Sequence, residues 1–164
     1  MNAPEIEVGI VTISDRASAG TYQDESGPAL ERAVGGRGWK LKAKRIVPDD
    51  MAQIQTAILE LVDHEGCALV LTTGGTGVAP RDVTPEAVRV IATKELPGFG
   101  ELMRAESAKI SRHGMLSRNM AAVVGRALVV CLPGTPKGAV ECLSFVAGII
   151  PHAVALISEQ PTEH

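Results

Sequence analysis

The chain has 164 residues, of which 45% are hydrophobic and 21% are charged, and its formal net charge is −3. This length and balance are typical of one globular domain with a sizeable core, so we expect residues 1–164 to form a single domain. The negative charge and the four scattered aromatic side chains exclude a basic, base-stacking nucleic-acid surface, and no apolar run reaches membrane-spanning length.

The first half of the chain alternates short apolar runs with amphipathic stretches. The pattern predicts strands at 8–13, 39–47 and 68–71, with helices that begin at Pro28 and after Asp50, where Gln53 completes a capping pair. A third helix is predicted after Thr84, which we expect to be the N-cap, with Pro85 at the first helical position. This order predicts a three-layer α/β fold, with a mostly parallel sheet and helices on both of its faces.

The second half adds an antiparallel element. After a break at 96–98, a helix is predicted over 99–110, followed by a polar loop over 111–117 that exposes His113. Apolar runs at 120–124 and 128–132 flank Gly125-Arg126, which predicts a hairpin. Thr135 is expected to cap the last long helix, Pro151 to kink or restart it, and the tail from Pro161 to fray.

A glycine-rich turn, Gly74-Gly75-Thr76-Gly77, follows the third predicted strand directly. Such a turn leaves backbone N–H groups open to anionic oxygens, and it lies where open α/β sheets bind ligands. No lysine completes a P-loop, and Pro80 stands where a dinucleotide fingerprint has its third glycine. The turn therefore predicts a phosphate site with Asp82 beside a metal, or simply a tight turn with a surface aspartate.

Polar residues follow the other predicted strands as well. Ser14 and Asp15 follow the first strand, where they bind a ligand or form a local turn, and Asp49 follows the second. Asp50 has a structural use as a helix cap, so Asp49 is the better functional candidate. Carboxylates beside phosphate repel it unless a cation lies between them, and Mg²⁺ binds through one or two carboxylates plus phosphates. We therefore predict that Asp49 and Asp82 hold Mg²⁺.

Three charged residues near helices allow two interpretations. Glu101 and Arg104 lie three apart on one helix face, either as a surface ion pair or as a polar wall of a pocket. Lys137 adds positive charge to the predicted helix start after Thr135, or is an ordinary surface residue.

The three cysteines form no Cys-x-x-Cys pair, which is typical of reduced thiols in a cytoplasmic protein.

Several segments together resemble one family. The run TTGGTGVAPRDVTPE at 72–86 is similar to the signature of the molybdopterin adenylyltransferase family, of the MogA/MoaB type and also found as the gephyrin G domain. The segments ISDR with Asp24, VPDD, LPGFGELMR, MLSR and LPGTPKG resemble further family segments in order, closest to MogA. Cys131 departs from the pattern, because many relatives have asparagine there, and this difference bears on specificity.

The resemblance implies adenylyl transfer from ATP to molybdopterin in molybdenum cofactor biosynthesis, with release of pyrophosphate. It implies that Asp49 and Asp82 are the catalytic, Mg²⁺-binding pair. It implies nucleotide binding by Gly74, Gly75, Thr76, Gly77, Pro133 and Gly134. It implies binding of pterin or phosphate by Ser14, Asp15, Glu101, Arg104, Ser117, Arg118 and Lys137. The family also implies a homotrimer and a molybdenum-insertion enzyme as partner. Two alternatives remain open: a non-catalytic molybdopterin-binding module of the MoaB type, and a CinA-type nucleotide pyrophosphate hydrolase.

Overall fold

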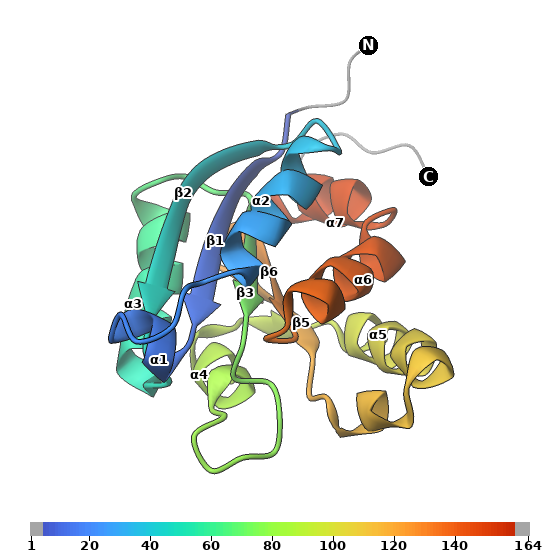
Figure 1. The fold of residues 1–164 in the computed structure, drawn as a ribbon. Helices are drawn as coiled ribbons and strands as arrows, with labels where there is room; N and C mark the ends of the chain where they lie inside the picture. The colour runs from blue at the N-terminus through green and yellow to red at the C-terminus, as the bar shows by residue number, and fades with distance from the viewer. Residues whose placement is uncertain (1–4, 160–164) are drawn as a thin grey trace.

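A six-stranded mixed sheet with helices on both faces makes up the computed structural model, which describes residues 5–159 (Figure 1). The strands are β1 (Glu7–Ile13), β2 (Lys40–Val47), β3 (Leu69–Thr73), β4 (Lys94–Glu95), β5 (Met120–Val124) and β6 (Ala127–Leu132). The helices are α1 (Asp15–Ser18), α2 (Ser26–Gly35), α3 (Met51–Asp63), α4 (Thr84–Ile91), α5 (Pro97–Ile110), the 3-10 helix η1 (Arg112–Leu116), α6 (Pro136–Val146) and α7 (Ile150–Ile157).

The sheet order is β2-β1-β3-β6-β5-β4, with β2, β1, β3 and β6 parallel and β5 antiparallel to both of its neighbours. This arrangement confirms the predicted α/β class and the hairpin at Gly125-Arg126. The central strands β1, β3 and β6 are mostly apolar because side chains on both of their faces are buried.

Two hydrophobic cores lie on opposite faces of the sheet. In β3, Leu69 and Leu71 point into the core shared with α2, α5, α6 and α7, while Val70 points into the core shared with α3 and α4. In Figure 1, α3 and α4 accordingly lie on the side of the sheet away from α2, α6 and α7. Side chains that alternate between the faces at every second residue of a strand produce both cores from one apolar run.

The carboxyl ends of four parallel strands meet at one edge of the sheet. Ile13 pairs with Val47, Thr12 with Thr73, and Thr73 with Leu132 in the strand register. The loops that leave these strands therefore begin side by side, as the sequence predicts for the ligand-binding edge of an open α/β sheet.

Several predicted boundaries are wrong for local physical reasons. Thr84 does not cap α4: it is the first helical residue, Val83 precedes it as N-cap, and the Thr84 hydroxyl donates to the Gly74 carbonyl instead. Helix α2 begins at Ser26, before Pro28, and α5 begins at Pro97, where a proline has no N–H to lose. The short strand β4 and the 3-10 helix within the expected polar loop have no counterpart in the predictions.

Other local predictions are confirmed. Asp50 accepts from the Gln53 backbone N–H at 2.9 Å, and Thr135 accepts from the Gly138 N–H at 3.1 Å. Helices α6 and α7 meet at an angle of 71° near Pro151. Among residues 5–159, no single helix is both long and apolar enough to span a membrane, although α6 and α7 taken together meet that test of length and composition. The tail from Pro161 lies outside the described residues.

All three cysteines are buried free thiols, as predicted. Burial raises the pKa of the Cys67 and Cys131 thiols to about 11, so both are protonated at neutral pH. Cys131 lies within β6 with its side chain in the core shared with α3 and α4, two residues before the cavity-lining loop at the strand end. It is a core residue in this chain.

Candidate active site

A cavity of about 510 Å³ opens at the carboxyl edge of the sheet, between the ends of β1, β2, β3 and β6. We call it the strand-end cavity. It is lined by seven of the predicted site residues: Ser14, Asp15, Asp49, Gly74, Gly75, Asp82 and Gly134. These residues come from separate loops of the chain, so the convergence predicted from the strand ends is present.

The glycine turn begins at the floor of this cavity and depends on two glycines. Gly74 has φ of +106°, and a Cβ there would lie 2.1 Å from the Ile13 carbonyl oxygen. Gly75 has φ of +70°, and a Cβ there would lie 2.1 Å from the Thr84 hydroxyl. Only glycine fits both conformation and space, so the backbone of β3 can pass directly against β1 before it turns.

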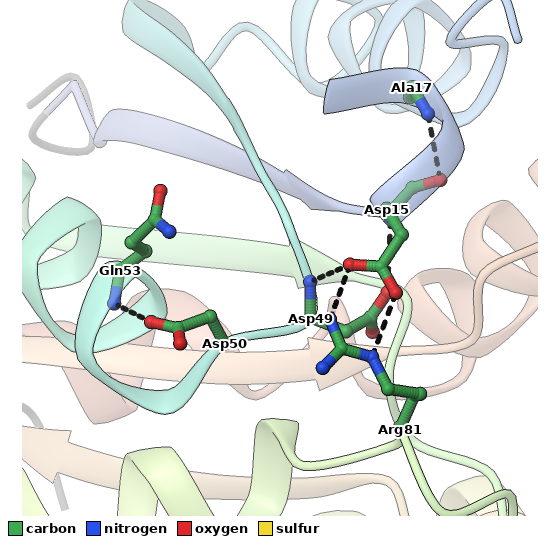
Figure 2. Close-up of polar contacts among 7 residues, drawn as sticks. Asp15, Ala17, Asp49, Asp50, Gln53 and Arg81 are labelled. Carbon is green, nitrogen blue, oxygen red and sulfur yellow. Dashed lines mark hydrogen bonds and ion pairs between the residues drawn. The ribbon is translucent and has the colours of Figure 1, made fainter. Parts of the chain in front are cut away.

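Three carboxylates line this cavity: Asp15, Asp49 and Asp82, here called the acid cluster. The Asp49 backbone N–H donates to Asp15 Oδ1 at 3.0 Å, and the Asp15 N–H donates to Asp49 Oδ2 at 3.1 Å. This reciprocal pair ties the loop after β1 to the loop after β2 (Figure 2). Asp82 accepts from the Ala79 N–H at 2.9 Å, which closes the glycine loop on itself.

The surroundings of Asp15 and Asp49 shift their pKa values in opposite directions. The Arg81 guanidinium binds both oxygens of Asp15, at 2.8 and 3.0 Å, and holds the pKa of Asp15 below its usual range. Burial raises the pKa of Asp49, and the negative charges of Asp15 and Asp82 raise it further. A cation beside Asp49 would therefore offset the burial and the like charge that raise its pKa. Asp50, by contrast, turns toward Gln53 on α3 and away from the cluster (Figure 2).

The free carboxylate oxygens fit a hard divalent cation that takes some ligands from the protein and the others from a substrate. Asp49 and Asp82 each use one oxygen for a backbone N–H, which leaves the other oxygen of each without a protein donor in the described part of the chain. Among residues 5–159, no group of three or more histidine, cysteine, aspartate or glutamate side chains is arranged to hold a metal by itself. Mg²⁺ takes oxygen ligands and is usually bound by one or two carboxylates plus substrate phosphates, which matches this pair.

Three other predicted residues line a second cavity of about 520 Å³, between α5, η1 and the start of β5. They are Arg104, Ser117 and Arg118. The Ser117 hydroxyl is buried there without a partner among the described residues, and Arg104 donates to the Asn119 carbonyl at 2.8 Å. Arg104 lines this second cavity and not the strand-end cavity. No ion pair joins it to Glu101 in the part of the chain that the structure describes, and a role of Arg104 in substrate binding stays a prediction.

Arg118 connects the second cavity to the glycine loop. Its guanidinium donates to the carbonyls of Gly77 and Asp82, both at 2.8 Å, and forms a short ion pair with Glu86 on α4. Its backbone N–H donates to the Thr76 carbonyl at 2.8 Å. These bonds support the loop that carries Asp82 from behind, so Arg118 is also a positioning residue for the strand-end cavity.

The remaining predicted residues line neither cavity. Thr76 and Gly77 lie on the Arg118 side of the loop, and the Pro133 carbonyl accepts from the Thr73 hydroxyl at 2.6 Å. Glu101 is exposed on α5. Lys137 has a side chain that is 82% exposed and lies 3.8 Å from Glu141, the surface arrangement that the sequence left open.

Several cavity residues were not assigned from the sequence. The Thr12 hydroxyl donates to Asp24 at 2.9 Å, and the Ser26 hydroxyl donates to the Gly134 carbonyl at 2.7 Å, so both bonds shape the cavity wall. Asp24 also accepts from the Gly27 N–H at 3.0 Å, three residues on. That Asp-x-x-Gly spacing was the available signal, because it indicates a side-chain cap at a helix start.

Comparison with known proteins gives consistent matches. Residues 9–152 match the protein family described as a probable molybdopterin binding domain. The chain is 45% identical over 149 residues to the molybdopterin adenylyltransferase of Escherichia coli K12, and the match covers 86% of this chain and 73% of that one. It is 42% identical over 156 residues to the protein of that name from Helicobacter pylori J99, covering 93% and 88%. The crystal structure of the molybdopterin biosynthesis enzyme MoaB from Thermus thermophilus matches with a TM-score of 0.89 at 41% identity, covering 96% of this chain and 99% of that one.

Proposed function

The chain belongs to the family of probable molybdopterin binding domains, and we propose that it is an enzyme that transfers the adenylyl group of ATP to molybdopterin and releases pyrophosphate. Its 45% identity to the Escherichia coli molybdopterin adenylyltransferase supports this reaction. The observation that carries the proposal is the meeting of the Gly74-Gly75 turn with the carboxylates of Asp49 and Asp82 in one cavity. A phosphate-binding turn beside paired carboxylates suits a nucleotide that arrives with a divalent cation.

The reaction requires little covalent chemistry from the protein. An oxygen of the molybdopterin phosphate forms a bond to the α-phosphorus of ATP, and the bond from that phosphorus to the pyrophosphate oxygen breaks. A phosphomonoester has a second pKa of about 6, so the attacking oxygen is already anionic at neutral pH and needs no general base. Catalysis then consists of positioning the two substrates and neutralising the charge on the phosphates.

The predicted site residues have separate roles in this proposal. Asp49 and Asp82 would hold Mg²⁺, which supplies positive charge to the triphosphate when it is bound. Gly74 and Gly75 give the phosphates a surface without side chains, Thr76 and Gly77 continue the nucleotide-binding loop, and Pro133 and Gly134 shape the adenosine side. Binding of pterin and its phosphate is assigned to Ser14 and Asp15 in the strand-end cavity and to Arg104, Ser117 and Arg118 in the second cavity. For Glu101 and Lys137, which line neither cavity, the same assignment is supported by the family resemblance alone.

The wider setting of the reaction is also part of the proposal. The three buried free thiols are typical of a reducing compartment, which supports the cytoplasm as its site. The family resemblance supports a homotrimer and delivery of the adenylylated product to a molybdenum-insertion enzyme. A binding module without catalysis is the second candidate, and the match of residues 9–152 to a probable molybdopterin binding domain favours it over the hydrolase.

A product assay with ATP, Mg²⁺ and molybdopterin tests the proposal. We expect adenylylated molybdopterin and pyrophosphate from the unaltered chain, and rates lower by about a hundredfold or more for Asp49→Asn and Asp82→Asn. Asp50→Asn is the matched control, because Asp50 caps α3 outside the cavity and asparagine caps a helix as well as aspartate does. Its rate should equal that of the unaltered chain.

The other outcomes separate the alternatives. Molybdopterin binding without any adenylylated product, under conditions in which the Escherichia coli relative is active, would contradict catalysis and leave the binding module. Cleavage of a nucleotide in the absence of molybdopterin would instead indicate a nucleotide pyrophosphate hydrolase. A normal rate for both Asp49→Asn and Asp82→Asn would overturn the metal-site assignment.

A further inference from the structure

Arg81, in the loop that follows the glycine turn, makes a specific contact that contributes little to the stability of the fold. It lies in the exposed segment 78–81, between the glycine turn and Asp82, and its side chain is 66% exposed. Its guanidinium nevertheless makes a two-point contact with Asp15, through Nε at 3.0 Å and Nη2 at 2.8 Å (Figure 2). Asp15 is the first residue of α1, 66 residues away in the chain.

This ion pair contributes little to stability, because both partners face water. The Asp15 side chain is 42% exposed, and exposed pairs of this kind are commonly worth almost nothing after the cost of ordering two side chains. Its position is more informative than its strength. The pair places a positive charge against the acid cluster, and Arg81 counteracts the burial and like charge that raise the pKa of Asp49.

An arginine held in this way is ready to exchange partners. Its planar fork binds carboxylate and phosphate with the same bidentate geometry, and a polyphosphate carries more negative charge than one carboxylate. Arg81 is not the only donor to Asp15, since Asp15 Oδ1 also accepts from the Asp49 backbone N–H at 3.0 Å. Arg81 does not itself line the strand-end cavity, but it contacts Asp15, which does. Arg16 does line the cavity, and its guanidinium stacks on the Tyr22 ring, 4.8 Å from the ring centre.

We propose that Arg81 binds the phosphate groups of the nucleotide, and that Asp15 is the partner of the guanidinium until the phosphates take the place of Asp15. This inference rests on the proposed function, because it assumes a nucleoside triphosphate in the strand-end cavity. It differs from a purely structural role, in which Arg81 only fixes Asp15. The two roles differ in whether the effect of removing the Asp15 charge depends on Arg81.

Calorimetric titration of the full chain with ATP and Mg²⁺, in the absence of molybdopterin, measures the binding step alone. Arg81→Ala should weaken ATP binding by about tenfold, because the charge-assisted contact between Arg81 and phosphate is lost. The ion pair with Asp15, which the unaltered chain must break to bind ATP, is too weak to offset this loss. Binding of adenosine, which has no phosphate, should not change. The ATP affinity of Arg81→Lys should lie between that of the unaltered chain and that of Arg81→Ala, because lysine keeps the charge but lacks the planar guanidinium.

Arg45→Ala is the matched control for the loss of one positive charge. Arg45 lies on β2, pairs with Glu60 and Glu65, and lines neither cavity. It should bind ATP as the unaltered chain does. Thermal unfolding of each variant shows that it is folded at the temperature of the titration.

Comparison of Asp15→Asn with and without Arg81 decides between the two roles of Arg81, because loss of a carboxylate charge beside phosphate favours ATP in either role. Asparagine can still accept from the Asp49 N–H, but it no longer holds the guanidinium. ATP binding should therefore become tighter, and this gain should shrink or disappear in the double variant Asp15→Asn, Arg81→Ala. Weaker binding by Asp15→Asn alone would overturn the exchange.

Two further results separate this inference from the function on which it rests. Equal ATP affinity for Arg81→Ala and Arg45→Ala would overturn the inference, while product formation by the same variants would leave the proposed reaction intact. No ATP binding by the unaltered chain would overturn both.

Discussion

Gly74→Ala is the substitution whose cost follows most directly from the geometry at the sheet edge. The new methyl would meet the Ile13 carbonyl oxygen at 2.1 Å, in a residue that has φ of +106°. Left-handed backbone costs an alanine about 1–2 kcal/mol, and overpacking against atoms that cannot move adds about 1–3 kcal/mol. Ile13 cannot yield easily, because the strand that it ends pairs with both β2 and β3. We expect a total loss of about 2–5 kcal/mol.

Gly20→Ala is the control that separates the two costs. Gly20 also has a positive φ, of +76°, but a Cβ there would meet nothing within 4 Å. Urea unfolding should show a loss of about 1–2 kcal/mol for Gly20→Ala and a clearly larger loss for Gly74→Ala. The same free energy of unfolding for the two variants would refute the claim that Gly74 is required for the close approach of β3 to β1.

Three further predictions concern contacts around the loop. Thr84→Val should lower the free energy of unfolding by about 1–3 kcal/mol, because the Gly74 carbonyl loses its buried donor, whereas Thr84→Ser should keep most of it; urea unfolding measures both. Asp49→Asn should raise the free energy of unfolding at pH 7, since the raised pKa of Asp49 means that its ionised form is unfavourable in the fold. This gain should fade toward pH values of about 4, where the carboxyl is protonated in the unfolded chain as well. A destabilised variant would contradict the claim that ionised Asp49 is unfavourable in the fold. Because Arg118 lowers the pKa of Glu86, their pair stabilises the fold fully above about pH 4.3 and less as pH falls through the lowered pKa. Glu86→Gln should therefore unfold more easily at pH 7 and lose less stability on acidification, as a pH series of urea curves would show.

The sequence predicted the edge of the sheet well because the signals there are local. Apolar runs that are buried on both faces mark the central strands, and the polar residues that follow each run had to meet at one edge. This is why Asp15, Asp49 and Asp82 were placed together before their contacts were known. The same reasoning separated Asp49 from Asp50, since the cap formed by Asp50 is a local pattern.

The features that were missed depend on contacts between distant residues. Thr84 has the sequence of a helix cap, yet a buried carbonyl ten residues earlier takes its hydroxyl. Arg118 supports the glycine loop from 36 residues beyond Asp82, through backbone carbonyls that leave no trace in the sequence pattern. Strand β4 has only two residues, which is too short for any periodicity. Glu101 and Lys137 were suggested by resemblance, and the cavity walls do not include them.

Transfer of labelled phosphorus tests the proposed reaction most directly. ATP labelled at its α-phosphate would be mixed with the unaltered chain, Mg²⁺ and molybdopterin, and the pterin and phosphate products would be separated. Adenylyl transfer predicts that the label appears in the pterin product and that unlabelled pyrophosphate is released in equal amount. Label that stays in free AMP, or a pterin product labelled only from γ-labelled ATP, would contradict adenylyl transfer at the strand-end cavity.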